Sequence, residues 1–326
     1  MNITAKQIAE MVGVSRQAVY SVLSHKPKCL VSPEKKEKIL FLAKAYHYKP
    51  NMAAVSLNGK PTFQIGAVLD SFTGMEGRII SRLAPKLEIE NYSLQASMIT
   101  GIQQGIDLIR KYSSCGMDAV IFSGSRLTDI QYEDYPVPLL AVETDFGTDF
   151  AAGSRMATEH LIRVHGHRKI VHVAAEAGPF PKYLGYCEAM KAAGLKPFPV
   201  LHTILNPQFS TELKRYLDSG VTAFVASGDA KASRLIYYLR NQGIRVPEDV
   251  AVTGVDAFGN YPEIASVAAP VEKIAAQGCR MILAKIRGKI LRRLEPELIL
   301  PEFKPSRSCG CPPVQFDNFG EYYPVI

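Results

Sequence analysis

Apolar residues recur at two different spacings along the chain. In residues 1–49 they lie three and four positions apart, which is typical of helices that bury one face. From residue 64 onward, apolar runs of four or five residues alternate with longer amphipathic segments. This alternation of strands and helices predicts parallel sheets covered by helices. About twelve such elements exceed one comfortable sheet, so we expect two similar α/β lobes with a cleft between them.

The first residues contain a complete helix start. Thr4 and Gln7 have the spacing of a capping box, in which each side chain bonds to the backbone amide of the other residue. Gly13 is a natural stop, because glycine readily adopts the left-handed conformation that closes a helix. A third helix is expected to begin at Ser32 and Pro33 and to turn four side chains inward: Ile39, Leu40, Ala43 and Tyr46.

The helix between them has the residues of a DNA-reading element. Ser15 caps a helix from Arg16 to about Ser24, and its polar face carries Arg16, Gln17, Tyr20 and Ser21. Two short helices joined by a glycine-containing turn form a helix-turn-helix, whose second helix enters the major groove. Arginine recognises guanine there, and glutamine recognises adenine. The alternative is an ordinary helical hairpin.

Charge supports the DNA-binding interpretation. Residues 1–62 hold ten basic and three acidic side chains, so this part of the chain carries the whole formal net charge of +7. A basic module joined to a neutral body is typical of a nucleic-acid-binding head. Beyond it, Asn51 can cap a helix of two turns at most, which forms only when it packs against something. Such a segment suits a hinge that orders on DNA.

Several strings in order resemble the LacI/GalR family of bacterial transcription regulators. In the head these are A-x-x-V-G-V-S-x-x-x-V, S-P-E-K-K-E-K-I and Y-K-P-N-x-x-A-x-S-L. In the body they are A-T-E-H-L-I at 157–162, G-x-x-V-P-x-D-V-x-V-x-G-x-D at 243–256 and R-S-C-G at 307–310. The resemblance implies a DNA-binding head at 1–49, a hinge at 50–63, a two-lobed core at 64–308 that resembles periplasmic binding proteins, and a tail at 309–326.

The resemblance also implies the DNA contacts. In the family, a leucine pair from two hinge helices wedges open a base step in the minor groove, and Leu57 matches that leucine. Val55 replaces the usual hinge arginine, and Tyr20 is bulky for its place, so we expect an atypical operator. The candidate contacts are Thr4, Ser15, Arg16, Gln17, Tyr20, Ser21, Ser24, Asn51, Ala54 and Leu57.

For the body, the resemblance implies a small effector, expected to be a carbohydrate, in the cleft. Four residues match family positions near it: Phe72, Asp149, Lys182 and Asp256. Asp149 and Asp256 have an alternative role as helix caps, and Phe72 has one as a core residue. The segment 70–77 is shorter than in the family and lacks its proline, and Gly228 stands where many sugar-binding members have asparagine. An effector of another class, or a protein partner in its place, therefore stays open.

Together these features predict a repressor that acts as a cytoplasmic homodimer on a pseudo-palindromic operator, because one short head contacts too little DNA for specificity. A pure small-molecule binding protein is an alternative, although the N-terminus has no secretory signal and the head is basic. No nucleophile motif or phosphate loop argues for an enzyme, and no stretch approaches the length of a membrane helix. We expect no cofactor. Cys309 and Cys311 offer two thiols, but a metal site needs two further ligands nearby, so we expect no metal either.

Overall fold

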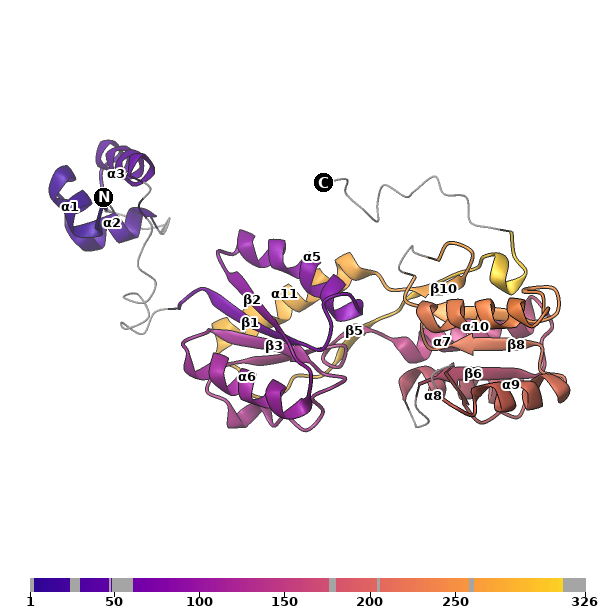
Figure 1. Cartoon of the computed structure of the whole chain (residues 1–326). Coiled ribbons are helices and arrows are strands. Elements are labelled where there is room, and N and C mark those ends of the chain that lie inside the picture. Colours follow the sequence, from indigo (N-terminus) through magenta and orange to yellow (C-terminus); the bar gives the residue numbers. More distant parts are fainter. Residues whose placement is uncertain are drawn as a thin grey trace. The chain divides into compact units, whose positions relative to one another are not determined.

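The structure is a computed structural model that describes residues 3–23, 30–46, 48, 61–175, 180–203, 206–257 and 261–312. The chain divides into two compact units, Met1–Phe63 and Gln64–Ile326 (Figure 1). The predicted hinge contacts Asn51, Ala54 and Leu57, and Ser24 in the head, lie outside the described residues. None of the described helices has an apolar stretch long enough to cross a membrane.

The described residues of the first unit form a head of three helices, α1 (Ala5–Val12), α2 (Arg16–Leu23) and α3 (Pro33–Ala45). The predicted capping box is confirmed: the Gln7 amide donates to Thr4 Oγ1 at 3.3 Å, and the Thr4 amide donates to Gln7 Oε1 at 2.8 Å. Gly13 ends α1 with a φ of 66°. Pro33 is the first residue of α3, but the Ser32 side chain makes no capping hydrogen bond.

All three helices contribute to the core of the head, through Ile8, Val12, Val19, Val22, Ile39 and Leu42. The expectation for α3 was wrong in part, because Leu40 is 43% exposed and Tyr46 is 47% exposed. Ile39 sets the inward direction of α3, and Leu42 is the residue three positions further along the same face. Leu40 is rotated by about 100° from Ile39, which turns it toward solvent.

The first lobe of the second unit contains a six-stranded sheet of parallel strands in the order β11-β5-β4-β3-β1-β2. Helix α6 (Ile102–Ser114) packs on one face of this sheet, and α5 (Met75–Ile89) packs beside α11 (Val271–Gly288). A short 3-10 helix, η1 (Tyr132–Asp134), precedes β4. The strands are β1 (Gln64–Leu69), β2 (Ser93–Met98), β3 (Ala119–Ser123), β4 (Leu139–Val142), β5 (Phe146–Thr148) and β11 (Glu297–Ile299).

The second lobe repeats this plan, with the sheet order β12-β10-β9-β8-β6-β7. Its strands are parallel except that β12 pairs antiparallel with β10. The strands are β6 (Ile170–Ala174), β7 (Leu201–His202), β8 (Ala223–Ala226), β9 (Ala251–Val255), β10 (Ala265–Ala268) and β12 (Glu302–Lys304). The predicted fold class, a helical head followed by two parallel-sheet lobes, is confirmed.

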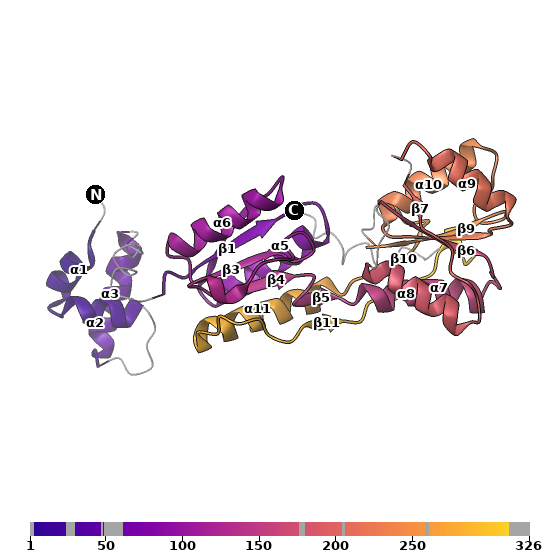
Figure 2. The same ribbon diagram turned by 90° about the horizontal axis from the view of Figure 1, so that it is seen from below.

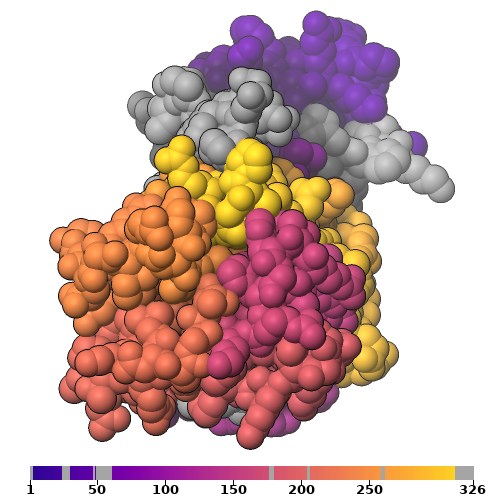
Figure 3. Space-filling model, turned by 90° about the vertical axis from the view of Figure 1, so that its right-hand side faces the viewer, coloured from indigo at the N-terminus to yellow at the C-terminus, as the bar shows by residue number. Residues whose placement is uncertain are grey.

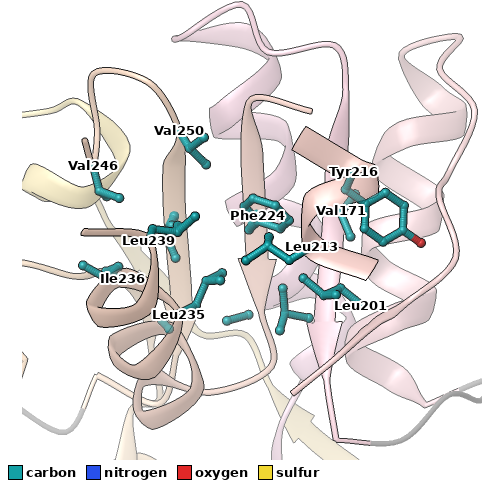
Figure 4. Packing of buried hydrophobic residues seen from close by; sticks show 14 of the residues in the cluster. Val171, Leu201, Leu213, Tyr216, Phe224, Leu235, Ile236, Leu239, Val246 and Val250 are labelled. Atoms are coloured by element: carbon teal, nitrogen blue, oxygen red, sulfur yellow. The ribbon is translucent and has the colours of Figure 1, made fainter. Parts of the chain in front are cut away.

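Helices cover both faces of the second sheet. One face packs against α9 (Phe209–Asp218) and α10 (Asp229–Asn241), and the other packs against α7 (Phe150–Arg163) and α8 (Pro181–Ala192). Successive strand residues serve opposite faces, as the pleat requires. On β8, Phe224 lies in the α9–α10 core (Figure 4). The next residue, Val225, lies in the α7–α8 core.

The chain passes between the two lobes three times: from β5 to α7, from β10 to α11, and from β11 to β12 (Figure 2). The 3-10 helix η2 (Arg307–Cys309) follows β12 in the second lobe. Each sheet is therefore completed by an edge strand from the last described part of the chain. The sequence patterns did not predict β5, β7, β10, β11, β12 or α9, because these strands have two to four residues and α9 lacks a long apolar run.

The α9–α10 core gives a direct test of the packing. Phe224 is fully buried there, so truncation to alanine removes a complete aromatic ring from a closed environment. We expect Phe224→Ala to lower the free energy of unfolding by about 3–5 kcal/mol. Chemical denaturation monitored by circular dichroism measures this change. Tyr237→Ala is the matched control, because Tyr237 is 70% exposed and its loss should change stability by less than about 0.5 kcal/mol.

Candidate functional site

The polar end of α2 presents two of the predicted DNA contacts to solvent. Arg16 and Gln17 are exposed in the first turn of this helix. Ser15 begins the helix, and its Oγ accepts a hydrogen bond from the Ala18 amide at 3.1 Å. The Arg16 guanidinium lies 5.8 Å from the centre of the Tyr20 ring. The arginine and the glutamine therefore both lie at the surface in the first turn of α2.

Three of the other predicted DNA contacts are partly buried or hydrogen-bonded within the head. Tyr20 is half-buried and packs against the core of the head. Burial and a hydrogen bond with Tyr20 raise the pKa of Tyr48 to about 12, so the Tyr48 phenol remains neutral. Ser21 is also half-buried, and the hydroxyl of Thr4 serves the capping box. Tyr20 therefore has a structural role in addition to the one predicted for it.

In the body, the strand order marks one edge of each sheet as a candidate ligand site. In both sheets, the order of the strands reverses between the first and third strand of the lobe, which are β1 and β3 in one and β6 and β8 in the other. Ligands of open α/β folds bind outside the carboxyl ends of the strands at such a switch point. The side chains that follow these strands are therefore the candidates for ligand binding.

In the second lobe, this edge brings Lys182 and Asp256 together. Lys182 Nζ lies 3.6 Å from Asp256 Oδ1 and donates a hydrogen bond to the Ser227 carbonyl at 2.9 Å. The same ammonium lies 4.1 Å from the centre of the Phe150 ring. Asp256 follows β9, and Lys182 lies in the first turn of α8. Burial raises the pKa of Asp256, whereas Lys182 and Lys231 oppose that increase.

In the first lobe, the corresponding edge is acidic. Glu76 is 5% exposed, and its Oε1 accepts hydrogen bonds from Ser123 Oγ at 2.6 Å and from Ser125 Oγ at 3.3 Å. Burial, followed by a hydrogen bond with Asp70, raises the pKa of Glu76 to about 8. Burial also raises the pKa of Glu143 to about 7. These carboxyls lie at the ends of β1, β3 and β4, and Glu76 is largely protonated at neutral pH.

Interactions between the lobes connect the carboxyl edge of the first sheet with that of the second. Arg78 of α5 donates a hydrogen bond from Nη1 to the Asp256 carbonyl at 3.4 Å, which connects the lobes directly. The charge of Lys182 lowers the pKa of Glu143, and the charge of Asp256 raises it, so groups from opposite lobes act on one carboxyl. The two carboxyl edges therefore form one polar site.

Unusual backbone conformations occur at the same place. Asp256 has a φ of 108°, Ala257 has 44° and Glu143 has 69°. Positive φ is uncommon for residues other than glycine and costs about 1–3 kcal/mol each in the least populated regions. Such strain persists only where the surrounding structure holds it, and it clusters at binding and catalytic sites.

A cavity of about 110 Å³ lies in the second lobe. Lys231 and Arg234 contribute its positive charge, and Val173, Thr203 and Phe209 contribute much of its wall. Burial, followed by the charge of Lys182, lowers the pKa of Lys231. The cavity therefore extends the polar site along the ends of β6 and β7.

The other two predicted effector residues, Phe72 and Asp149, do not contact Lys182 or Asp256 through any hydrogen bond described in the structure. Phe72 is 50% exposed in the loop after β1, so it is not a core residue and its ring is accessible. Asp149 Oδ1 accepts a hydrogen bond from the Ala152 amide at 2.9 Å and caps α7, and the Asp149 amide donates to the Ile299 carbonyl. The capping role that the sequence left open for Asp149 is therefore the one that the structure describes.

Sequence reasoning missed Glu76, Arg78, Glu143 and Lys231. A usable signal existed for Glu143, which directly follows the apolar run Leu139–Val142 and so had to lie at a carboxyl end. Glu76 and Arg78 lie in the first turn of α5, where acidic and basic residues are common on exposed faces. Nothing in their spacing distinguishes them from a solvated helix.

Comparisons with known proteins agree with this arrangement. Residues 158–309 match the family described as periplasmic binding protein-like domain. The HTH-type transcriptional repressor PurR of Pasteurella multocida is 25% identical over 337 residues, which cover 93% of this chain and 99% of that protein. The structure is similar to that of the Lac repressor dimer bound to operator and the anti-inducer ONPF, with a TM-score of 0.73, 19% identity and coverage of 95% and 99%. It is also similar to the transcriptional regulator CelR in complex with cellobiose, with a TM-score of 0.61, 23% identity and coverage of 94% and 100%.

The raised pKa of Glu76 predicts a pH-dependent stability. Between the ordinary value of 4.5 and the folded value of about 8, the folded protein binds more protons than the unfolded chain. The free energy of unfolding therefore falls as the pH rises through this range, by about 1 kcal/mol per pH unit for this group. Glu76→Gln should remove this part of the slope in denaturation curves from pH 5 to 8. Glu88→Gln, at an exposed position of the same helix, should keep the slope of the unmodified protein.

Proposed function

We propose that the chain is a repressor of the LacI/GalR family of bacterial transcription regulators and that a small effector controls its operator affinity. The observation that carries this proposal is the pairing of two features in one chain. A basic head exposes Arg16 and Gln17 at the start of a helix, and a two-lobed body gathers buried charges at facing carboxyl edges.

The head supplies sequence recognition. Arg16 reads guanine through two parallel hydrogen bonds, and Gln17 reads adenine, while the lysines of the head bind phosphates. Ser15, Tyr20, Ser21 and Thr4 border this surface, and Ser24, Asn51, Ala54 and Leu57 complete the contacts proposed from the family. The protein acts as a homodimer, since two heads on half-sites about one helical turn apart are needed for useful specificity. Its place of action is the cytoplasm, where bacterial operator DNA is found.

The body supplies the response. Lys182 and Asp256 from one lobe, with Glu76 and Glu143 from the other, offer hydrogen-bond donors and acceptors to a molecule rich in hydroxyls. Phe72 provides an accessible apolar ring of the kind that packs on a sugar face. A carbohydrate or a closely related metabolite is therefore the effector class proposed here, and it acts by binding without chemical conversion.

The coupling works through the contacts between the lobes. An effector that binds both edges replaces or strengthens the contact of Arg78 with the Asp256 carbonyl and so favours one arrangement of the lobes. Ligand control of this kind corresponds to a coupling free energy of about 1–3 kcal/mol, which changes operator affinity five- to 150-fold. The dimer transmits that preference to the two heads.

The DNA-binding part predicts a loss of sequence preference. Arg16→Ala should weaken binding to the operator by about 1–3 kcal/mol while binding to unrelated DNA changes much less. Selection of binding sites from a random DNA pool, followed by fluorescence anisotropy, measures both effects. Lys38→Ala is the control, because an exposed lysine of α3 can affect only phosphate binding and should alter all sequences equally. An unchanged preference in Arg16→Ala would remove this residue from base recognition.

The proposed effector site predicts that effector binding can be lost without loss of operator binding. We expect one member of a panel of pentoses, hexoses, sugar acids and sugar phosphates to raise the melting temperature, since a ligand at 100 times its Kd adds about 2.7 kcal/mol of stability. Asp256→Asn should abolish that shift and leave operator binding intact. Asp249→Asn, at an exposed ion pair of the same lobe, should retain the shift. A retained shift in Asp256→Asn would place the effector elsewhere.

A further inference from the structure

Two thiols and two imidazoles meet at a point where the end of α7 lies beside the last described residues. They are His160, His165, Cys309 and Cys311, and one ligand atom from each lies within 4.8 Å of the other three. The expectation that Cys309 and Cys311 lack further ligands was wrong, because the fold brings in histidines about 150 positions earlier in the chain. In Figure 3, the yellow C-terminal segment lies on the surface next to the magenta segment that contains α7.

The distances between these atoms have the dimensions of a tetrahedral metal site. With Zn–N of about 2.0 Å and Zn–S of about 2.3 Å, a tetrahedron places two nitrogens about 3.3 Å apart and a sulfur about 3.5 Å from a nitrogen. His160 Nε2 lies 3.2 Å from His165 Nε2 and 3.6 Å from Cys309 Sγ. Cys311 Sγ lies 3.5 Å from His160 Nε2 and 3.4 Å from His165 Nε2. Four of the six edges of the tetrahedron therefore agree with a single central ion.

Local structure explains how the four ligands converge. His160 is in the last turn of α7, and His165 lies two positions beyond the end of that helix. Four residues separate the two histidines, a spacing found in zinc sites. Gly310 between the cysteines has a φ of 98°, which turns the chain so that both sulfurs face the same point. A side chain at this position would also meet the His165 ring at 3.2 Å.

The surroundings suit a partly buried structural ion, because Cys309 is buried and the other three ligands are half-buried. Cys309 is 1% exposed, and the His160 ring packs against Phe303 with 4.8 Å between ring centres. Two thiolates and two neutral imidazoles balance the charge of a divalent ion, which limits the cost of burying it. The donor set of two sulfurs and two nitrogens in a tetrahedron favours zinc, and four protein ligands leave no open position for catalysis.

We propose that His160, His165, Cys309 and Cys311 bind one structural zinc ion, which fastens the C-terminal segment to α7. The segment also carries Ser308, whose Oγ accepts from the Ala265 amide at 2.9 Å and donates to the Val252 carbonyl at 2.6 Å. Zinc therefore stabilises the contacts of η2 with β9 and β10 as well. This proposal is independent of the regulatory function, because none of its ligands belongs to the polar site at the strand ends.

The metal content of the purified chain tests the proposal. The full chain, without a histidine tag and with reducing agent throughout, should contain about one zinc ion per molecule by plasma mass spectrometry. Cys311→Ser and His165→Gln should each lose most of this zinc. The matched controls Cys115→Ser, an exposed thiol, and His202→Gln, a histidine outside the cluster, should retain it. Zinc that is absent from the unmodified chain, or unchanged in both ligand variants, would overturn the proposal.

A second measurement does not depend on the folding of any variant. The unmodified chain, freed of metal by a chelator under reducing conditions, is titrated with cobalt(II). We expect the visible absorption of tetrahedral cobalt and a sulfur-to-cobalt charge-transfer band, saturating at about one equivalent, with a melting temperature that rises again on addition of zinc. An absence of both bands would contradict the site. So would a thiol titration and mass that show a Cys309–Cys311 disulfide in the chain as isolated under reducing conditions.

Discussion

Parallel strands bring all their carboxyl ends to one edge of a sheet, and both lobes of this protein depend on that constraint. The backbone path from strand to helix to strand leaves each loop after a strand on the same side. Asp70 and Glu143 follow two strands of the first sheet and are collected at its edge, and Asp256 follows β9 at the corresponding edge of the second sheet. The two sheets have the same strand order, so the same edge is presented twice. The polar site is a consequence of topology before any individual side chain is considered.

The site holds charges that the rest of the fold must support. Burial raises the pKa values of the Glu76 and Glu143 carboxyls and so favours their neutral forms. Positive φ angles at Glu143 and Asp256 add backbone strain. A half-buried pair such as Lys182 with Asp256 contributes little net stability after desolvation. The apolar cores on both faces of each sheet therefore offset the cost of a preorganised polar site, which is what selective recognition of a small polar molecule requires.

Sequence patterns predicted the parts of this structure that depend on local chemistry. The capping box at Thr4 and the buried strands around Ile65, Phe224 and Val252 follow from local spacing and apolar runs. The short edge strands β11 and β12 carry exposed charged residues and owe their existence to pairing with distant strands, so no local signal marks them. Lys182 and Asp256 were predicted from family resemblance and lie together, whereas Glu76 resembles any acidic residue of a helix. The histidines beside Cys309 are far apart from it in sequence, which is why the cluster could not be foreseen.

The three passages between the lobes also determine the order in which the protein can fold during synthesis. The head is continuous in the sequence, and α3, the last of its described helices, ends at Ala45, so it can fold while the rest of the chain is still being made. The first lobe lacks its edge strand β11 until Ile299 has left the ribosome. At about 5–20 residues per second, the interval amounts to roughly 10–50 s. A newborn molecule thus has a folded head well before it has a complete body, and the two sheets close almost together, when β11 and β12 have been made.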